Sequence, residues 1–137
     1  MKREHAMKNL FTLTAVIEAG AGLVFFLLPS VAATLLFGSP LEAPVAFMVT
    51  RLTGAALITL GIACWLARLD LESRTAAGLV TAMLLYNLAA LFILAYAGFG
   101  MGLVGVTLLL GVGLHSVMAV WCFACLRTRR TRAGINK

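Results

Sequence analysis

Residues 10–28 read LFTLTAVIEAGAGLVFFLL, an apolar run that is interrupted near its middle by one charged residue, Glu18. A helix of about twenty such residues crosses the ~30 Å hydrocarbon core of a bilayer. Three further apolar runs of similar length follow at residues 45–67, 75–97 and 101–126. The four runs predict an all-α membrane protein with four transmembrane helices.

The composition agrees with a membrane protein. Hydrophobic residues make up 62% of the 137 residues and charged residues only 12%, whereas charged residues approach ~25% in soluble domains. The first run is longer than the apolar part of a secretory signal peptide and carries a charge, so we expect it to be retained as the first helix. We therefore expect a multi-pass protein of a bacterial-type cytoplasmic (inner) membrane.

The basic residues lie at the ends of the apolar runs. Apart from Arg51, every Lys and Arg falls in the N-terminal stretch 1–9, in the link 68–74 or in the tail 127–137. Cytoplasmic loops are enriched in Lys and Arg, so we expect both termini and the middle link in the cytoplasm. Short links then favour an up-down-up-down four-helix bundle in the lipid bilayer. Nucleic-acid binding is not expected, because the basic residues are not interleaved with aromatic ones.

Three stretches lie between or beyond the apolar runs, and a different structure is predicted for each. Pro29 interrupts the first run, so Val31–Phe37 either continues that helix beyond a kink or forms a short interfacial helix. The glycine-rich stretch 98–102 connects the last two runs. The basic tail 127–137 has no apolar periodicity, and we expect it to be frayed or disordered.

Each apolar run carries one strongly polar residue near its middle. These residues are Glu18, Arg51, Asn87 and His115. A charge at the centre of a membrane helix costs roughly 2.5–3.5 kcal/mol on insertion scales, and such residues often mark functional sites. We expect Glu18 and Arg51 to form an ion pair, with Asn87 and His115 as hydrogen-bonding partners. The four side chains would then form one ligand-binding or proton-relay site.

These residues are compatible with three functions. The first is binding of a small lipophilic or ionisable ligand in a midplane cavity that the four polar residues line. The second is an accessory or structural subunit of a homodimer or larger membrane complex, in which the polar residues only hold the helices together. The third is proton-coupled export of a small molecule through Glu18. No nucleophile with a base, carboxylate cluster or phosphate loop is evident, so we do not expect an enzyme.

The three cysteines are the candidates for redox chemistry or for binding a soft metal. Cys64, Cys122 and Cys125 lie near the expected cytoplasmic ends of their helices. Four-helix quinone-linked thiol oxidoreductases also carry C-x-x-C in a membrane helix, but theirs faces the oxidising side, whereas Cys122 and Cys125 would face the reducing cytoplasm. We expect no catalytic residues, no metal and no cofactor; Cys122 and Cys125 stay the candidates for a soft metal, and haem or a quinone stays an alternative. Bis-histidine haem would need a second copy of the chain, because His115 is the sole histidine within an apolar run.

Two families share short patterns with the chain. Val16-Ile17-Glu18-Ala19-Gly20 resembles the first helix of the small multidrug resistance transporters, whose membrane glutamate exchanges protons for cationic drugs. The strong charge bias differs from the dual topology that those antiparallel dimers can use. The spacing Gly22-x5-Leu28-Pro29, Leu36-x-Gly38 and Arg51-x2-Gly54-x6-Gly61 is similar to DoxX-like small bacterial membrane proteins. That resemblance covers the first two helices and implies a four-helix membrane fold.

The distribution of basic residues gives a first prediction. A reporter fused after Lys137 should report a cytoplasmic location, and one inserted beside Ser39 should report a periplasmic location, because Lys and Arg resist translocation. A periplasmic signal from the fusion at Lys137 would contradict this orientation.

Overall fold

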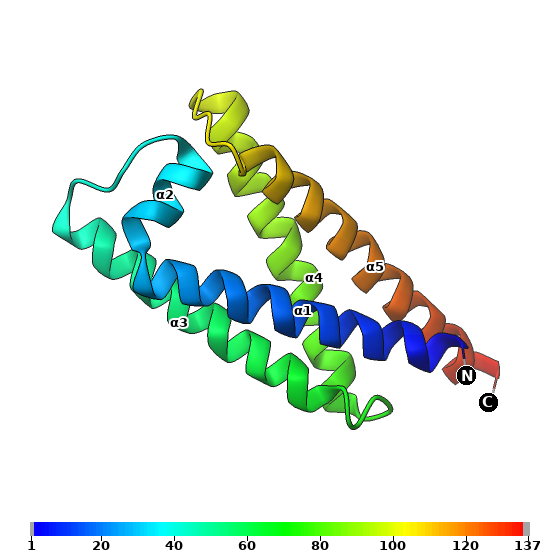
Figure 1. The fold of residues 1–137 in the computed structure, drawn as a ribbon. Helices are drawn as coiled ribbons and strands as arrows, with labels where there is room; N and C mark the ends of the chain where they lie inside the picture. The colour runs from blue at the N-terminus through cyan, green and yellow to red at the C-terminus, as the bar shows by residue number, and fades with distance from the viewer. Residues whose placement is uncertain (1, 136–137) are drawn as a thin grey trace.

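The computed structural model describes residues 2–135, in which every regular element is a helix (Figure 1). The elements are α1 (Lys2–Leu27), α2 (Pro29–Phe37), α3 (Pro44–Ala67), α4 (Arg74–Ala95), the π-helical turn η1 (Tyr96–Gly100) and α5 (Leu108–Ile135). Four helical segments are long and apolar enough to cross a membrane: Glu4–Leu27, Pro44–Ala67, Arg74–Gly100 and Leu108–Thr128. The all-α class and the four helices of membrane-spanning length are therefore confirmed.

Glycines allow α1 and α3 to pack with their backbones almost in contact. A Cβ atom added to Gly54 would lie 2.5 Å from the backbone nitrogen of Phe26, and one added to Gly22 would lie 2.7 Å from the backbone oxygen of Gly54. Gly61 faces the backbone of Ala15 in the same way, at 3.0 Å. Small residues at such an interface give the close backbone approach typical of membrane helices.

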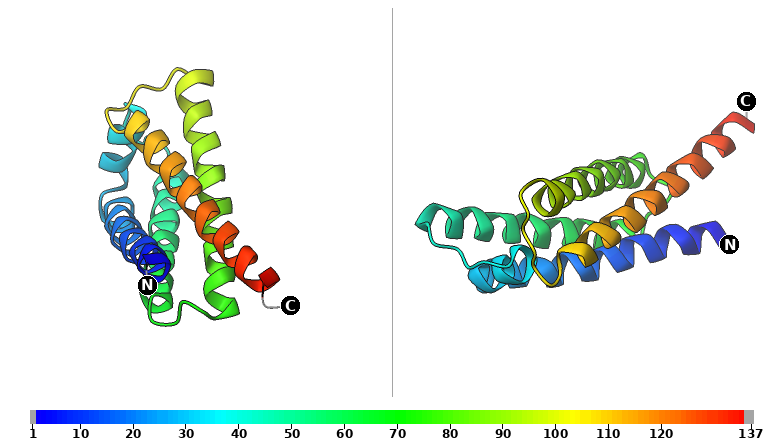
Figure 2. Two further views of the ribbon diagram at one scale, coloured as in Figure 1. Left: turned by 90° about the vertical axis from the view of Figure 1, so that its right-hand side faces the viewer. Right: turned by 90° about the horizontal axis from the view of Figure 1, so that it is seen from above.

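The second close pair is α4 with α5, and the two pairs meet each other over shorter stretches (Figure 2). A large buried cluster joins them, with members from α1, α3, α4 and α5: Met7, Leu10, Phe11, Ala15, Cys64, Ala76, Val80, Met83, Met118, Cys122 and Cys125. The cluster brings the N-terminal halves of α1 and α4 together with the last turn of α3 and the middle of α5. The start of α1 and the end of α5 accordingly lie at the same end of the molecule (Figure 1).

At the opposite end, α2 packs against the link between η1 and α5. Leu28 leaves the helical conformation, with φ −127° and ψ 56°, so Val31–Phe37 belongs to a separate helix instead of extending α1. The backbone nitrogen and the hydroxyl of Thr107 both donate hydrogen bonds to the backbone oxygen of Leu35, at 3.0 and 2.9 Å. A smaller buried cluster of Leu94, Ala97 and Leu108 lies beside this contact.

The fourth apolar run begins its helix at Leu108 and not at the expected residue 101. Gly102 has a positive φ of 70°, which stops a right-handed helix, and a Cβ on Gly105 would clash with the backbone of Leu36. Glycine also favours helix less than other residues by about 1 kcal/mol. The link 101–107 is therefore shaped by its contact with α2, which the apolar pattern of the sequence does not reveal.

Both ends of the chain continue helices beyond the apolar runs. α1 starts at Lys2, within the stretch 1–9, and α5 runs on to Ile135 through most of the basic tail. The helix α5 includes residues 127–135, for which the sequence predicts a frayed or disordered tail; residues 136–137 lie outside the described part. Arginine has a high helix propensity, and α5 supplies an existing helix to extend, so nucleation is not required.

The glycine contacts between α1 and α3 give a second prediction. Gly22→Ala should destabilise the protein by about 1–3 kcal/mol, because the added methyl overpacks a close backbone contact. Gly20→Ala is the matched control, since an added Cβ there meets nothing within 4 Å. Unfolding in mixed micelles would measure both. Equal effects of the two substitutions would contradict the packing described here.

Candidate functional site

Three of the four polar residues expected to meet do so, and Tyr86 joins them. The Tyr86 hydroxyl on α4 donates a hydrogen bond of 3.3 Å to Glu18 Oε2 on α1. His115 Nδ1 on α5 lies 2.8 Å from Asn87 Oδ1 on α4. The rings of Tyr86 and His115 meet edge to face, with centroids 5.6 Å apart. A polar network of Glu18, Tyr86, Asn87 and His115 thus connects three helices.

Asn87 determines how His115 is held. Its side-chain nitrogen donates to the backbone oxygen of Met83, one turn earlier on α4, at 2.8 Å. The amide oxygen is therefore turned toward α5, where it can only accept a hydrogen bond. It follows that Nδ1 of His115 carries the proton of this bond, which leaves Nε2 of a neutral imidazole as an acceptor.

Glu18 and Asn87 are buried between the helices, whereas Tyr86 and His115 are half-buried. Glu18 is 6% exposed and Asn87 is 2% exposed. Thr14 precedes Glu18 by one turn on the same face of α1. Its hydroxyl oxygen is buried and has no hydrogen-bond partner among the described residues. A buried hydroxyl without a partner costs free energy, so Thr14 offers an unused polar group beside the carboxyl group.

Arg51 does not join this network, and the expected ion pair with Glu18 is wrong. The side chain of Arg51 is exposed, and the contacts of Gly54 with Phe26 and of Gly61 with Ala15 fix the register of α1 against α3. In that register Arg51 lies beside the end of α1, about nine residues or ~14 Å along the axis from Glu18. The described residues contribute no cation to the carboxyl group.

Tyr86 and Thr14 are the members of the site that the sequence did not single out. Tyrosine is enriched at the two membrane–water interfaces, whereas Tyr86 lies near the middle of its span, next to Asn87. Its unusual depth is a signal that could have identified it. Thr14 carries no comparable signal, because threonine hydroxyls commonly bond to the backbone of their own helix.

Cys64, Cys122 and Cys125 are free, buried thiols in the large core cluster. Within the described part of the chain, no three His, Cys, Asp or Glu side chains lie together as they would around a metal ion. Cys122 and Cys125 thus lack a third ligand of these types for the soft-metal site considered from the sequence.

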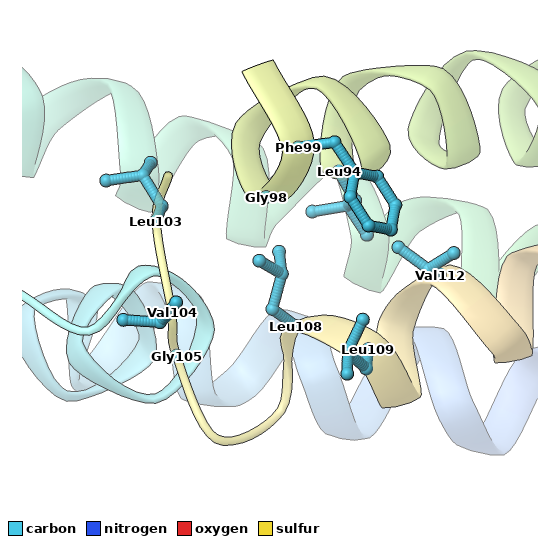
Figure 3. A pocket seen from close by; sticks show the side chains of 9 residues that line it. All are labelled: Leu94, Gly98, Phe99, Leu103, Val104, Gly105, Leu108, Leu109 and Val112. Carbon is cyan, nitrogen blue, oxygen red and sulfur yellow. The ribbon is translucent and has the colours of Figure 1, made fainter. Parts of the chain in front are cut away.

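A cavity of about 220 Å³ lies away from the polar network, between η1 and the start of α5. Apolar side chains and glycines line it: Leu94, Gly98, Phe99, Leu103, Val104, Gly105, Leu108, Leu109 and Val112 (Figure 3). None of Glu18, Arg51, Asn87 and His115 lines this cavity, so it is not the midplane cavity expected from the sequence.

Comparison of the chain with protein-family models, with curated proteins and with solved structures finds no match. The resemblance to DoxX-like proteins stays a prediction. The chemistry of the site therefore has to be inferred from its own side chains.

The network and the position of Arg51 give a third prediction, testable by two double-mutant cycles. Asn87→Leu and His115→Leu should couple by about 0.6–1.7 kcal/mol, between the average and the maximum measured for hydrogen bonds between membrane helices. Glu18→Gln and Arg51→Met should instead be additive within ~0.5 kcal/mol, because the two side chains are far apart. Unfolding free energies in mixed micelles would give both couplings, and a coupled Glu18–Arg51 cycle would overturn the register described above.

Proposed function

We propose that this chain is a small multi-pass membrane protein that binds a lipophilic ammonium-type cation at Glu18. In this proposal the four spans form an up-down-up-down bundle in a bacterial-type inner membrane, with both termini cytoplasmic. Tyr86, Asn87 and His115 complete the site. The observation that carries the proposal is a buried carboxyl group that has a hydroxyl partner but, among the described residues, no cationic one.

The charge of Glu18 is the first feature that supports cation binding. A carboxylate within a bilayer is expensive unless a proton or a cation neutralises it. The chain has five acidic residues, Glu4, Glu18, Glu42, Asp70 and Glu72, and Glu18 is the one that lies deep within a span. A positively charged molecule dissolved in the membrane would therefore find its strongest attraction at Glu18.

The aromatic rings beside Glu18 are the second feature that supports cation binding. Quaternary and alkylated ammonium groups are attracted to the faces of aromatic rings, and the ring of Tyr86 lies beside Glu18, next to the imidazole of His115. The bond from Tyr86 to Glu18 is 3.3 Å long, whereas hydroxyl–oxygen bonds are usually 2.7–2.8 Å. So loose a bond is readily exchanged for a ligand.

The position of Glu18 at the boundary between the two helix pairs is the third feature that supports the proposal, because it bears on how a ligand reaches the carboxyl group. The two close pairs, α1 with α3 and α4 with α5, approach each other over shorter stretches than the helices within each pair. Glu18 and Tyr86 lie on opposite sides of the boundary between the pairs. A lipophilic ligand already dissolved in the bilayer could reach the carboxyl group by separation of the pairs, without crossing water. No large rearrangement within either pair would be required.

Two other functions from the sequence can be weighed against this proposal. Proton-coupled export would use the same carboxyl group, since a proton and a cation compete for it. An accessory subunit would bury its apolar outer surface against partner helices. Within the most apolar stretch of each span, only 17–33% is buried inside the protein. Lipid covers the exposed apolar surface as well as partner helices would. The observation therefore does not favour a subunit.

Binding of matched probes would test the proposal. The purified protein in detergent should bind benzyltrimethylammonium more tightly than neopentylbenzene, which has the same shape but a carbon in place of the charged nitrogen. Glu18→Gln should remove this preference, at a cost of about 1–3 kcal/mol for one lost ionic contact. Arg51→Met is the control substitution and should leave it intact.

The opposite outcome is equally clear. Equal affinity for the charged and neutral probes, or an unchanged preference in folded Glu18→Gln protein, would contradict cation binding at Glu18. Circular dichroism and gel filtration would establish that the variants fold.

A further inference from the structure

The apolar cavity between η1 and the start of α5 is separate from the polar network described above. Its volume is about 220 Å³, and every side chain that lines it is apolar. Leu108 points from the start of α5 across the cavity toward Gly98 (Figure 3). An apolar cavity of about 150 Å³ in another protein excludes water and binds benzene. The larger cavity described here therefore suits a somewhat longer hydrocarbon group.

The wall of the cavity is held in place by contacts of the link 101–107. The backbone nitrogen of Leu103 donates a hydrogen bond of 3.0 Å to the backbone oxygen of Ala97. Thr107, at the other end of the link, is bonded twice to α2. Between them, Gly105 lies so close to the backbone of α2 that an added Cβ would clash. The link is thus tied to its neighbours and does not collapse into the cavity, which is preformed as in most ligand sites.

The mouth of the cavity lies on an apolar surface. Phe99 and Val104 line the cavity and are each 83% exposed, and Leu109 also lines it and is exposed. Residues 98–107 include no charged residue. The two helical segments that flank this stretch are long and apolar enough to cross a membrane. In a bilayer the mouth therefore opens toward lipid, and the hydrocarbon nearest to it is an acyl chain.

We propose that this cavity is a binding site for one acyl chain of a membrane phospholipid. The chain enters on the exposed side, beside Phe99 and Leu109, and its methylene groups contact Leu94 and Leu108 within the cavity. Lipid tails are as apolar as the cavity wall, so the gain is van der Waals contact that the wall otherwise lacks. The proposal does not depend on cation binding at Glu18, which does not line the cavity.

Nuclear Overhauser effects (NOEs) between lipid and protein would test the site. The full chain, deuterated except for its leucine and methionine methyl groups, would be placed in nanodiscs of dimyristoylphosphatidylcholine. Leu94 and Leu108 are only 8% and 3% exposed, so lipid on the outer surface does not reach them. Their methyl groups should nevertheless show NOEs to acyl-chain protons. The exposed Leu110 should show them as well, whereas Met83, which is fully buried away from the cavity, should show none.

A filled cavity gives the matched variant. Val112 lines the cavity, so the larger ring of Val112→Phe should occupy it and remove the NOEs at Leu94 and Leu108. Val117→Phe is the control, because it makes the same change on the same helix at an exposed residue outside the cavity. This control should keep both NOEs.

Three results would contradict the proposal. The first is wild-type protein in which lipid NOEs reach Leu110 but neither Leu94 nor Leu108. The second is folded Val112→Phe protein that keeps the NOEs at those two residues. The third uses benzene added to the nanodiscs: NOEs from benzene to Leu94 and Leu108, with none from lipid, would assign the cavity to a small free hydrocarbon instead of an acyl chain.

Discussion

The need of the Glu18 carboxyl group for a polar partner is the constraint to which the arrangement of the helices is most closely tied. A carboxyl group in the middle of α1 has no water to solvate it in a bilayer, so another helix has to supply a polar partner. α3 cannot do so, because it meets α1 through glycines and apolar side chains. The partner comes from α4 instead, so the carboxyl group lies at the boundary between the two helix pairs.

Three layers of contact then hold the two pairs together. At the end of the molecule where α1 begins, the large buried cluster fills the space between α1, α3, α4 and α5. In the middle lies the polar network of Glu18, Tyr86, Asn87 and His115. At the far end, α2 is bonded to the link before α5 through Thr107. The middle layer contains the loosest of these bonds, which is consistent with a ligand competing for the carboxyl group there.

The hydrophobic runs predict the four long helices well, because membrane insertion depends on length and apolarity more than on tertiary contacts. Polarity at matching depth also predicts the meeting of Glu18, Asn87 and His115. The same reasoning fails for Arg51, because depth along a helix does not give its register against a neighbour. That register follows from where Gly54 and Gly61 allow close approach, a packing property that a single sequence does not specify.

Two other features depend on tertiary contact in the same way. α5 starts at Leu108 because Gly105 packs against α2, and the role of Tyr86 arises only where α4 crosses α1. The orientation of the bundle in the membrane is different, since it follows from the placement of Lys and Arg along the chain. It stays a prediction that reporter fusions can settle.

The proposed function requires that a lipophilic ammonium-type cation lie against the Glu18 carboxyl group within the membrane. Solid-state NMR of the protein in lipid, with ¹³C in the Glu18 carboxyl group and ¹⁵N in benzyltrimethylammonium, measures their proximity directly. A dipolar coupling between the two labels is expected, and it should disappear when unlabelled probe displaces the labelled one. A bound probe without any coupling to Glu18 would contradict the proposed function.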